Sequence, residues 1–371
     1  MTEPLDIVIL GLSLSSSWGN GHATTFRALL RGLNEEGHRV LFLERDVPWY
    51  ASQRDLPEPD FCELKYYSSV DELTSVYNDR IRAADAVIIG SYVPEGVKVI
   101  DEVVALSAKR LCFYDIDTPV TLAKLDRGDE EYLARRQIPQ FDAYFSFSGG
   151  EVLERLENVY GSRKAIALYC SVDAARYQNT REAFQWDLGY LGTYSLDRQP
   201  TVERLLIEVA RRLPEKRFVV AGPQYPEDID WPSNVERIDH LPPAEHASFY
   251  SRQRFTLNVT RADMIAAGWS PSVRLFEAAA CGTPIISDYW RGLDELLPHG
   301  EAIIIAQRTD DVVEALSGTS SIQRDEIATN ARMRVLEEHT GLARSRQLVT
   351  ALKGFLPQVR AEQPALQRIS A

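Results

Sequence analysis

The feature that most constrains the fold is an alternation of short apolar runs with helix-length segments along both halves of the chain. In the first half the runs are rich in β-branched and aromatic residues, and they cover residues 6–12, 39–44, 86–90, 110–114 and 143–147. Between the first two runs, apolar residues recur with helical spacing at Phe26, Leu29, Leu30 and Leu33, and Gly37 follows as a stop signal. This alternation predicts a doubly wound parallel sheet with helices on both faces.

The second half of the chain repeats this organisation. Residues 186–195 (WDLGYLGTYS) again combine a strand, a glycine and a hydroxyl-rich loop, and a helical stripe over 202–213 follows. Further strands are predicted at 217–221, 255–259, 283–287 and 302–305. We therefore expect two Rossmann-like domains facing across a cleft, over 1–172 and 173–340. Residues 341–371 are predicted to form a C-terminal helix and tail. Packing of this segment against the N-terminal domain is one arrangement that the sequence leaves open.

Charge and cysteine content exclude several classes of protein. The formal net charge of -13 argues against a nucleic-acid partner, because phosphate backbones require a basic face. The four cysteines lack metal-ligand or disulfide-scaffold spacing and indicate reduced thiols. There is no signal-peptide pattern and no apolar stretch that approaches 18 residues. We expect a cytoplasmic protein without a transmembrane segment, and contact with a membrane surface stays open.

Two polar segments that follow predicted strands in the first half could carry chemistry. The loop after the first strand contains Gly19, Asn20 and Gly21, which permit close backbone approach, and then His22 near a helix N-terminus. His22 could contact an acceptor or serve as a base, and a structural histidine in a glycine loop is the alternative.

The second such segment is FYDIDTP, which ends a strand with Asp115 and Asp117. Both carboxylates would point to the same side if the strand continued through them. Metal binding, helix capping and orientation or deprotonation of an acceptor hydroxyl all fit this pattern.

The second half offers an anion site and a charged pair. Gly192, Thr193 and Arg198 lie in a loop before a helix, a composition that suits a diphosphate, with a solvated loop as the alternative. Arg274 and Glu277 are three residues apart within SPSVRLFEAAACGTPIISD, among small residues that let a helix pack closely on a sheet. A plain salt bridge between these two side chains is the alternative to a ligand site.

The segment LFEAAACGTPIISD resembles the donor site of GT-B glycosyltransferases, and S-x-R-L-F-E-x-x-A-C-G with FYDIDTP resembles the bacterial CgeB-like (spore-maturation-protein-like) group. The resemblance implies that Glu277 binds the nucleotide ribose. It implies diphosphate contacts at Gly192, Thr193 and Arg198 with Arg274 as a further cation, and nucleobase contacts around His240 and Leu241.

Two positions depart from the family pattern. Retaining members carry a second glutamate eight residues before the ribose-binding one, and this chain has Trp269 there. Many relatives have a histidine–aspartate pair where this chain has Asp115 and Asp117, while the GNGH loop resembles inverting relatives with a histidine near the acceptor.

We therefore predict a metal-independent glycosyltransferase that moves a sugar from a nucleoside-diphosphate sugar, bound by the second half, to an unidentified acceptor bound by the first half. His22, Asp115 and Asp117 are the candidate catalytic residues. A sugar-nucleotide epimerase of the same fold and a non-catalytic nucleotide-sugar-binding protein are the alternatives.

Overall fold

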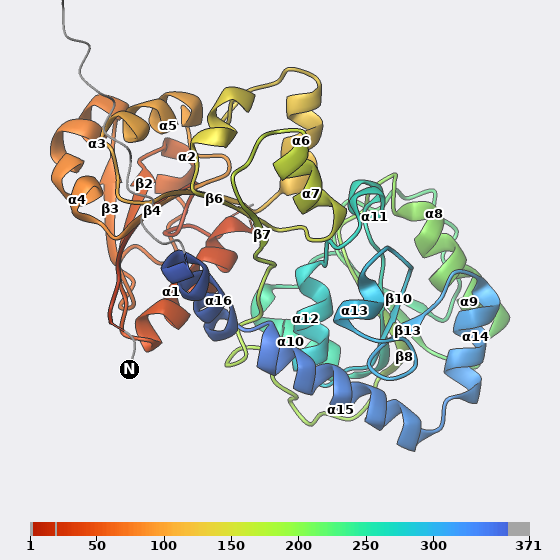
Figure 1. The fold of residues 1–371 in the computed structure, drawn as a ribbon. Coiled ribbons are helices and arrows are strands. Elements are labelled where there is room, and N and C mark those ends of the chain that lie inside the picture. The colour runs from red at the N-terminus through yellow and green to blue at the C-terminus, as the bar shows by residue number, and fades with distance from the viewer. Residues whose placement is uncertain (1–2, 19–20, 355–371) are drawn as a thin grey trace, which may run out of the picture.

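A computed structural model describes residues 3–18 and 21–354 and divides them into two α/β domains (Figure 1). The N-terminal domain contains a seven-stranded parallel sheet in the order β3-β2-β1-β4-β5-β6-β7. Its strands are β1 (Asp6–Gly11), β2 (Arg39–Arg45), β3 (Glu63–Tyr67), β4 (Ala86–Gly90), β5 (Leu111–Asp115), β6 (Ala143–Ser146) and β7 (Ala165–Ala167). Its helices are α1 (His22–Glu35), α2 (Pro48–Ala51), α3 (Val70–Val76), α4 (Asn78–Ala83), α5 (Gly96–Ala105), α6 (Thr118–Asp126), the 3₁₀ helix η1 (Arg135–Gln140) and α7 (Glu151–Asn158).

The C-terminal domain has a six-stranded parallel sheet in the order β10-β9-β8-β11-β12-β13. Its strands are β8 (Trp186–Leu191), β9 (Phe218–Ala221), β10 (Val235–Ile238), β11 (Gln253–Asn258), β12 (Ile285–Ser287) and β13 (Ile304–Ile305). Its helical segments are α8 (Gln199–Val202), the π-helical turn η2 (Glu203–Ile207), α9 (Glu208–Arg212), the 3₁₀ turn η3 (Pro243–Glu245), α10 (His246–Ser251), α11 (Ala262–Ala267), α12 (Val273–Ala280), α13 (Leu293–Leu296), α14 (Thr309–Gly318) and α15 (Ser321–Glu338).

Each sheet is covered on both faces, which explains why its central strands are apolar throughout. Separate clusters of buried side chains lie on the two faces of the first sheet and on the two faces of the second. The residues of β4 and β5 are all buried. Continuous apolar runs are the pattern expected of parallel strands buried on both sides. The predicted fold class, two doubly wound parallel sheets, is confirmed.

The strands missed by sequence analysis all lie at sheet edges. β3, β7 and β10 form outer strands of the two sheets. β3 alternates exposed and partly buried residues, and β10 has one exposed and two partly buried positions. An edge strand buries less of its surface, so β3 and β10 carry too few apolar residues to be recognised by hydrophobicity, whereas β7 is apolar but only three residues long.

The C-terminal helix α16 (Gly341–Gly354) returns to the N-terminal domain after α15 has passed along the C-terminal domain (Figure 1). It packs against α1, and Leu348 and Leu352 join the N-terminal core. Gly32 and Gly341 permit this close approach, because a side chain on either residue would collide with the backbone of the facing helix. An ion pair of 2.9 Å between Arg346 and Glu36 also joins the two helices. The tail beyond 354 lies outside the described residues.

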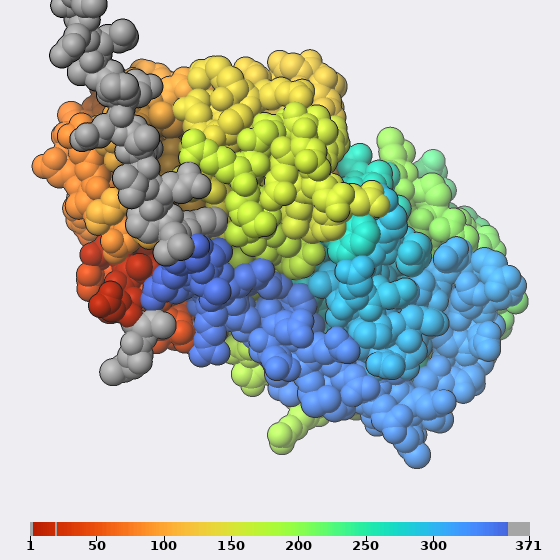
Figure 2. Space-filling model, in the orientation of Figure 1, coloured from red at the N-terminus to blue at the C-terminus, as the bar shows by residue number. Residues whose placement is uncertain are grey.

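The two domains also touch on the side opposite this crossover. Helix α11 of the C-terminal domain lies against α6 of the N-terminal domain, and Ala267 packs on the N-terminal core. Figure 2 shows the yellow-green surface of the N-terminal domain in contact with the cyan surface of its neighbour. The carboxyl ends of the parallel strands carry the loops that hold the candidate site residues, as expected for open α/β sheets.

Candidate functional site

The loop between β8 and α8 holds a buried cation, Arg198. Its side chain is 3% exposed, and its guanidinium donates to Ser195 Oγ at 2.8 Å and to the carbonyl oxygen of Thr193 at 2.5 Å. Burial and the nearby charges of Arg274 and Arg261 lower the pKa of Arg198. No carboxylate lies within ion-pair distance of Arg198 in the part of the chain that the structure describes. An unpaired buried cation creates a site for an anion.

Arg274 and Arg261 complete a cluster of three guanidinium groups. Arg274 lies in the first turn of α12, and its buried Nη1 has no hydrogen-bond partner among the described residues. Arg261 is exposed and precedes α11. Within residues 3–18 and 21–354, none of the three forms an ion pair with an acidic side chain. This arrangement favours a ligand with more than one negative charge, because three neighbouring cations repel one another until an anion binds.

The first turn of α12 adds backbone donors to this cluster. Ser272 is the residue before the helix, but its hydroxyl donates to Asn258 Oδ1 at 3.0 Å and does not cap the helix. The first amide groups of an α-helix have no partner within the helix, and they favour an anion. Asn258 in turn bonds Ser287 Oγ at 2.9 Å, so that α12 is tied to β11 and β12.

The glycines of this region allow the β8 and β9 loops to approach closely. Gly222 has φ of +138°, and a side chain there would collide with the carbonyl group of Gly192. A side chain on Gly192 would meet the hydroxyl of Tyr190, a buried atom without a hydrogen-bond partner in the described chain. Thr193 contributes the carbonyl group that orients Arg198. The structure thus brings together Gly192, Thr193, Arg198 and Arg274.

Glu277 lies one turn beyond Arg274 on α12 and is 6% exposed. It forms no salt bridge with Arg274 in the described residues, so the alternative of a plain helical ion pair is excluded. Its Oε2 atom is 3.5 Å from the Tyr250 hydroxyl, and the Tyr177 hydroxyl is a second partner. Burial raises the pKa of the Glu277 carboxyl group. These two phenols hold a carboxylate that retains capacity for hydroxyl donors of a ligand.

The predicted nucleobase segment is connected to Glu277 through side chains. The Tyr177 hydroxyl is 3.3 Å from His246 Nδ1, and His246 also bonds the backbone of Leu241. Burial lowers the pKa of His246 to about 4, so it is neutral near pH 7. Leu241 is buried and His240 is exposed. Sequence reasoning missed Tyr177, His246 and Tyr250, because these aromatic residues carry no motif.

In the N-terminal domain, the carboxyl ends of β1 and β5 bring together His22 and Asp117. Atom Nε2 of His22 lies 3.0 Å from Asp117 Oδ2. The His22 side chain is 7% exposed and that of Asp117 is 42% exposed, so the carboxylate is the accessible member of the pair. His22 Nδ1 has no partner among the described atoms. Gly21 precedes α1, whereas Gly19 and Asn20 lie outside the described residues.

The loop that precedes His22 is held by two carboxylates, of which Glu44 is buried and Asp55 is exposed. Glu44, at the end of β2, accepts hydrogen bonds from the Leu14 amide at 2.6 Å and from the Ser15 amide and hydroxyl at 2.9 and 2.6 Å. Asp55 accepts from the Ser17 amide at 2.9 Å. A loop anchored in this way enters α1 in one defined direction, which fixes the position of the His22 ring.

Asp115 does not occupy the position predicted for it. Strand β5 ends at Asp115, so Asp115 and Asp117 do not share one side of a continuing strand. Asp115 is fully buried and accepts from the Thr121 hydroxyl at 2.7 Å, the Tyr144 hydroxyl at 2.6 Å and the Asp117 amide at 3.2 Å. The structure therefore favours Asp117 over Asp115 for contact with an acceptor, and the role predicted for Asp115 stays a prediction. In its buried position, Asp115 holds the turn that carries Asp117.

Burial raises the pKa of Asp115 to about 6, which makes stability depend on pH. The folded state then binds more protons than the unfolded state between about pH 4 and 6, so stability should fall as pH rises through this window, by on the order of 3 kcal/mol. In urea unfolding, Asp115→Asn should gain stability relative to the wild type over the same window. Asp126→Asn on α6 is the control. Its stability relative to the wild type should change with pH in the opposite direction, because Tyr160 and Arg155 lower the pKa of Asp126. A parallel pH dependence of Asp115→Asn and the wild type would contradict the burial effect.

Tyr92 is a candidate site residue that sequence reasoning missed. It follows β4 with φ of +61°, a conformation that is rare for a bulky residue, and its ring lies edge-on to His22 with centroids 5.5 Å apart. Its other side contacts Tyr132, with centroids 4.3 Å apart. Backbone strain of this kind concentrates at functional sites. Only the position of Tyr92 directly after a strand could have indicated it.

Other features of the molecule lie away from these groups. A cavity of about 460 Å³ lies at the amino ends of β1, β2 and β3, the opposite edge of the sheet from His22. Burial raises the pKa of its one thiol, Cys62, to about 12, which disfavours the reactive thiolate form near pH 7. No group of three metal-ligating side chains occurs in the described residues. No helix over the same residues is long and apolar enough to span a membrane.

Comparison with known proteins places the chain in a structural class. Residues 198–350 match a protein family described as glycosyl transferase-like. No curated protein matches the chain by sequence. These residues cover most of the C-terminal domain, including Arg198, Arg274 and Glu277.

Solved structures match the chain over nearly its whole length. HepE from Anabaena, in complex with UDP and glucose, has 13% sequence identity and a TM-score of 0.64, over 94% of this chain and 100% of that chain. Sucrose-phosphate synthase from Thermosynechococcus elongatus has 12% identity and a TM-score of 0.65, over 94% and 98%. An alpha-glucosyltransferase in complex with UDP-glucose and DNA containing an abasic site has 13% identity and a TM-score of 0.66, over 95% and 100%. At these identities the likeness shows the fold, which is the GT-B fold.

Proposed function

We propose that this GT-B protein is a glycosyltransferase whose C-terminal domain binds a nucleoside-diphosphate sugar and whose N-terminal domain binds an acceptor with a free hydroxyl group. The observation that carries the proposal is the cluster of Arg198, Arg261 and Arg274, which has no acidic partner in the described chain. A diphosphate supplies the charge that this cluster lacks. Glu277, on the same helix as Arg274, would accept hydrogen bonds from the two ribose hydroxyls.

In the proposed reaction, the bond between the anomeric carbon and the diphosphate oxygen breaks, and a bond from that carbon to the acceptor oxygen forms. Negative charge grows on the departing diphosphate, so Arg198 and Arg274 stabilise the transition state more than the ground state. The acceptor proton passes to the His22–Asp117 pair. Asp117 is its accessible member, and a hydrogen bond from His22 Nε2 orients that carboxylate.

The first test is a thermal-shift titration with UDP, GDP, dTDP, ADP and CMP. A ligand at 100 times its Kd should raise the free energy of unfolding by about 2.7 kcal/mol. A selective shift with one diphosphate identifies the donor class, and transfer assays with the matching nucleotide sugars follow. No shift with any nucleotide would contradict the donor site. Conversion of the sugar nucleotide to its epimer, without transfer, would replace the proposal with the epimerase alternative.

We also propose that the reaction needs no metal ion, because arginine side chains supply the charge that a divalent cation supplies elsewhere. Initial rates measured with and without a chelator should agree within about a factor of two, since no step of the proposed binding depends on a metal. Loss of transfer in the chelator, restored by Mg²⁺ or Mn²⁺, would contradict this expectation.

We propose that, within this class, the protein is a CgeB-like glycosyltransferase, and the S-x-R-L-F-E-x-x-A-C-G string supports this proposal. We also propose that it acts in the cytoplasm. Its four cysteines are free, and three of them are buried, which suits a reducing compartment.

A further inference from the structure

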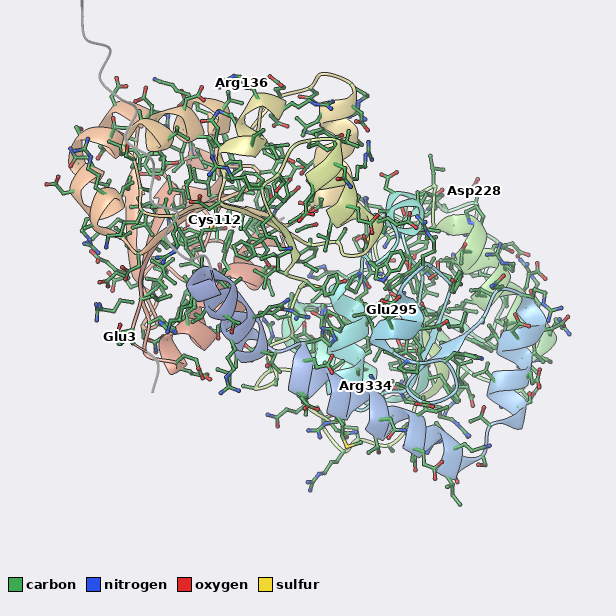
Figure 3. The ribbon with its side chains drawn as sticks, in the orientation of Figure 1. Glu3, Cys112, Arg136, Asp228, Glu295 and Arg334 are labelled. Atoms are coloured by element: carbon green, nitrogen blue, oxygen red, sulfur yellow. The ribbon has the colours of Figure 1, made fainter. Side chains whose placement is uncertain are left out.

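Trp269 occupies the contact between the two domains. Its indole ring lies between Gly150 of the N-terminal domain and Gly292 of the C-terminal domain, and a side chain on either glycine would collide with the ring. Both glycines have positive φ, at +54° and +91°. Atom Nε1 of Trp269 donates to Glu295 Oε2 at 2.8 Å, and Glu295 belongs to α13 (Figure 3). The ring is therefore held in one orientation by both domains.

Buried hydrogen bonds also hold Trp269 and its neighbours between the two domains. The Gly149 amide donates to the carbonyl oxygen of Trp269 at 2.9 Å. The hydroxyl groups of Ser148 and Ser270 are 2.6 Å apart, and both side chains are almost fully buried. Trp269 itself has φ of +41°, which is strained for a residue with a side chain. Strain of this kind persists only where the surroundings over-determine the conformation.

A continuous set of hydrogen bonds connects this contact to Thr118, the residue that follows Asp117. The Ser148 amide donates to Ser146 Oγ at 3.0 Å, and Ser146 Oγ lies 2.9 Å from Thr118 Oγ1. Thr118 opens helix α6 directly after Asp117. All three of these hydroxyl side chains are fully buried, and hydrogen bonds between buried groups are costly to break. A displacement of the domain contact would therefore move the start of α6.

On the C-terminal side of Trp269, the chain continues from the domain contact to the cation cluster. Ser270 is two residues before Ser272, whose hydroxyl ties the start of α12 to Asn258. Arg274 and Glu277 lie on the first two turns of that helix. The segment from Trp269 to Ser272 thus joins the groups of the proposed donor site to those of the proposed acceptor site.

We propose that Trp269 is a positioning residue that fixes the relative placement of the two domains, so that the donor sugar faces Asp117. This inference rests on the proposed function for its catalytic consequence, but the domain placement can be measured without it. Misplacement of reacting groups by about 1 Å can cost on the order of 100-fold in rate. Trp269 occupies the position of the second glutamate of retaining relatives, and the indole contributes packing at that position.

The test compares Trp269→Ala with the wild type by two readouts. The first is the distance distribution between spin labels at Val159→Cys and Met333→Cys, two exposed positions in different domains. The second is kinetic, with nucleoside diphosphate affinity measured by calorimetry. Trp269→Ala should broaden the distance distribution and lower kcat by roughly 10- to 100-fold, with the Kd of the nucleoside diphosphate within about twofold of wild type.

Glu151→Gln is the matched control at the same contact. It removes the exposed 2.6 Å ion pair with Arg291, which joins the domains but contributes little. Its distance distribution and kcat should stay near wild type. Gly150→Ala is the second disruptive variant. Its added methyl group would collide with the indole ring, while Trp269 itself is unchanged. This variant keeps the test decisive if Trp269→Ala folds poorly.

Unchanged distance distributions in both disruptive variants would overturn the inference. So would a loss of nucleotide affinity that parallels the loss of kcat at an unchanged domain distance, because Trp269 would then contact the donor directly. If the wild type transferred no sugar at all, the proposed function would fail, while the distance measurement would still test the role of Trp269 in holding the domains together.

Discussion

Replacing Asp117 by asparagine should lower kcat for sugar transfer by roughly 10²- to 10⁴-fold, the usual contribution of a general base. The substitution keeps the size of the side chain, but the amide is a far weaker proton acceptor than the carboxylate. The nucleoside diphosphate site lies in the other domain, so its Kd should stay within about twofold of wild type. Steady-state kinetics and calorimetry on the same preparation check both expectations.

His22→Gln provides the comparison within the pair. It removes the ring whose Nε2 atom lies 3.0 Å from Asp117 Oδ2, so it should lower kcat in the same direction through the loss of orientation. Asp129→Asn, an exposed residue that follows α6, is the control and should leave kcat unchanged. Wild-type turnover in Asp117→Asn would contradict the role of this pair as proton acceptor. A reaction without a protein base would then be the better account.

Substitutions at Arg274 and Glu277 should separate the two halves of the proposed donor site. Arg274→Gln should weaken binding of both the nucleoside diphosphate and inorganic pyrophosphate, by roughly 10- to 100-fold, because a charge-assisted contact is lost. Glu277→Ala should weaken binding of the nucleoside diphosphate by a similar factor. It should leave pyrophosphate binding near wild type, because pyrophosphate has no ribose hydroxyls. Isothermal titration calorimetry with the two ligands gives all four values.

The control for both variants is Arg334→Gln, which removes a charge from α15, a helix outside the three-arginine cluster; Figure 3 labels this side chain. It should bind both ligands as the wild type does. If Glu277→Ala weakened pyrophosphate binding as strongly as nucleoside diphosphate binding, Glu277 would act by positioning Arg274. If it weakened neither ligand, the assignment of Glu277 to the ribose would be lost.

The architecture could be predicted from the sequence because its signals are local. Strands buried on both faces must be apolar throughout, and each predicted run overlaps a strand of the structure. Helix α1 follows from the spacing of Phe26, Leu29, Leu30 and Leu33, and it ends before Gly37 with its positive φ. The glycine-rich loops identified the carboxyl ends of the strands, where ligands bind in such sheets. These features depend on neighbours within one or two turns of the chain.

The chemistry of the candidate site depended on contacts that local patterns do not encode. His22 and Asp117 are 95 positions apart, and they meet because β1, β4 and β5 are consecutive in the sheet. Asp115 and Asp117 look alike in the sequence, yet the end of β5 buries one and exposes the other. Only the tertiary structure places Trp269 between the domains, because strand order and domain contact decide which distant side chains meet, whereas hydrophobic periodicity reports only which side of each element is buried.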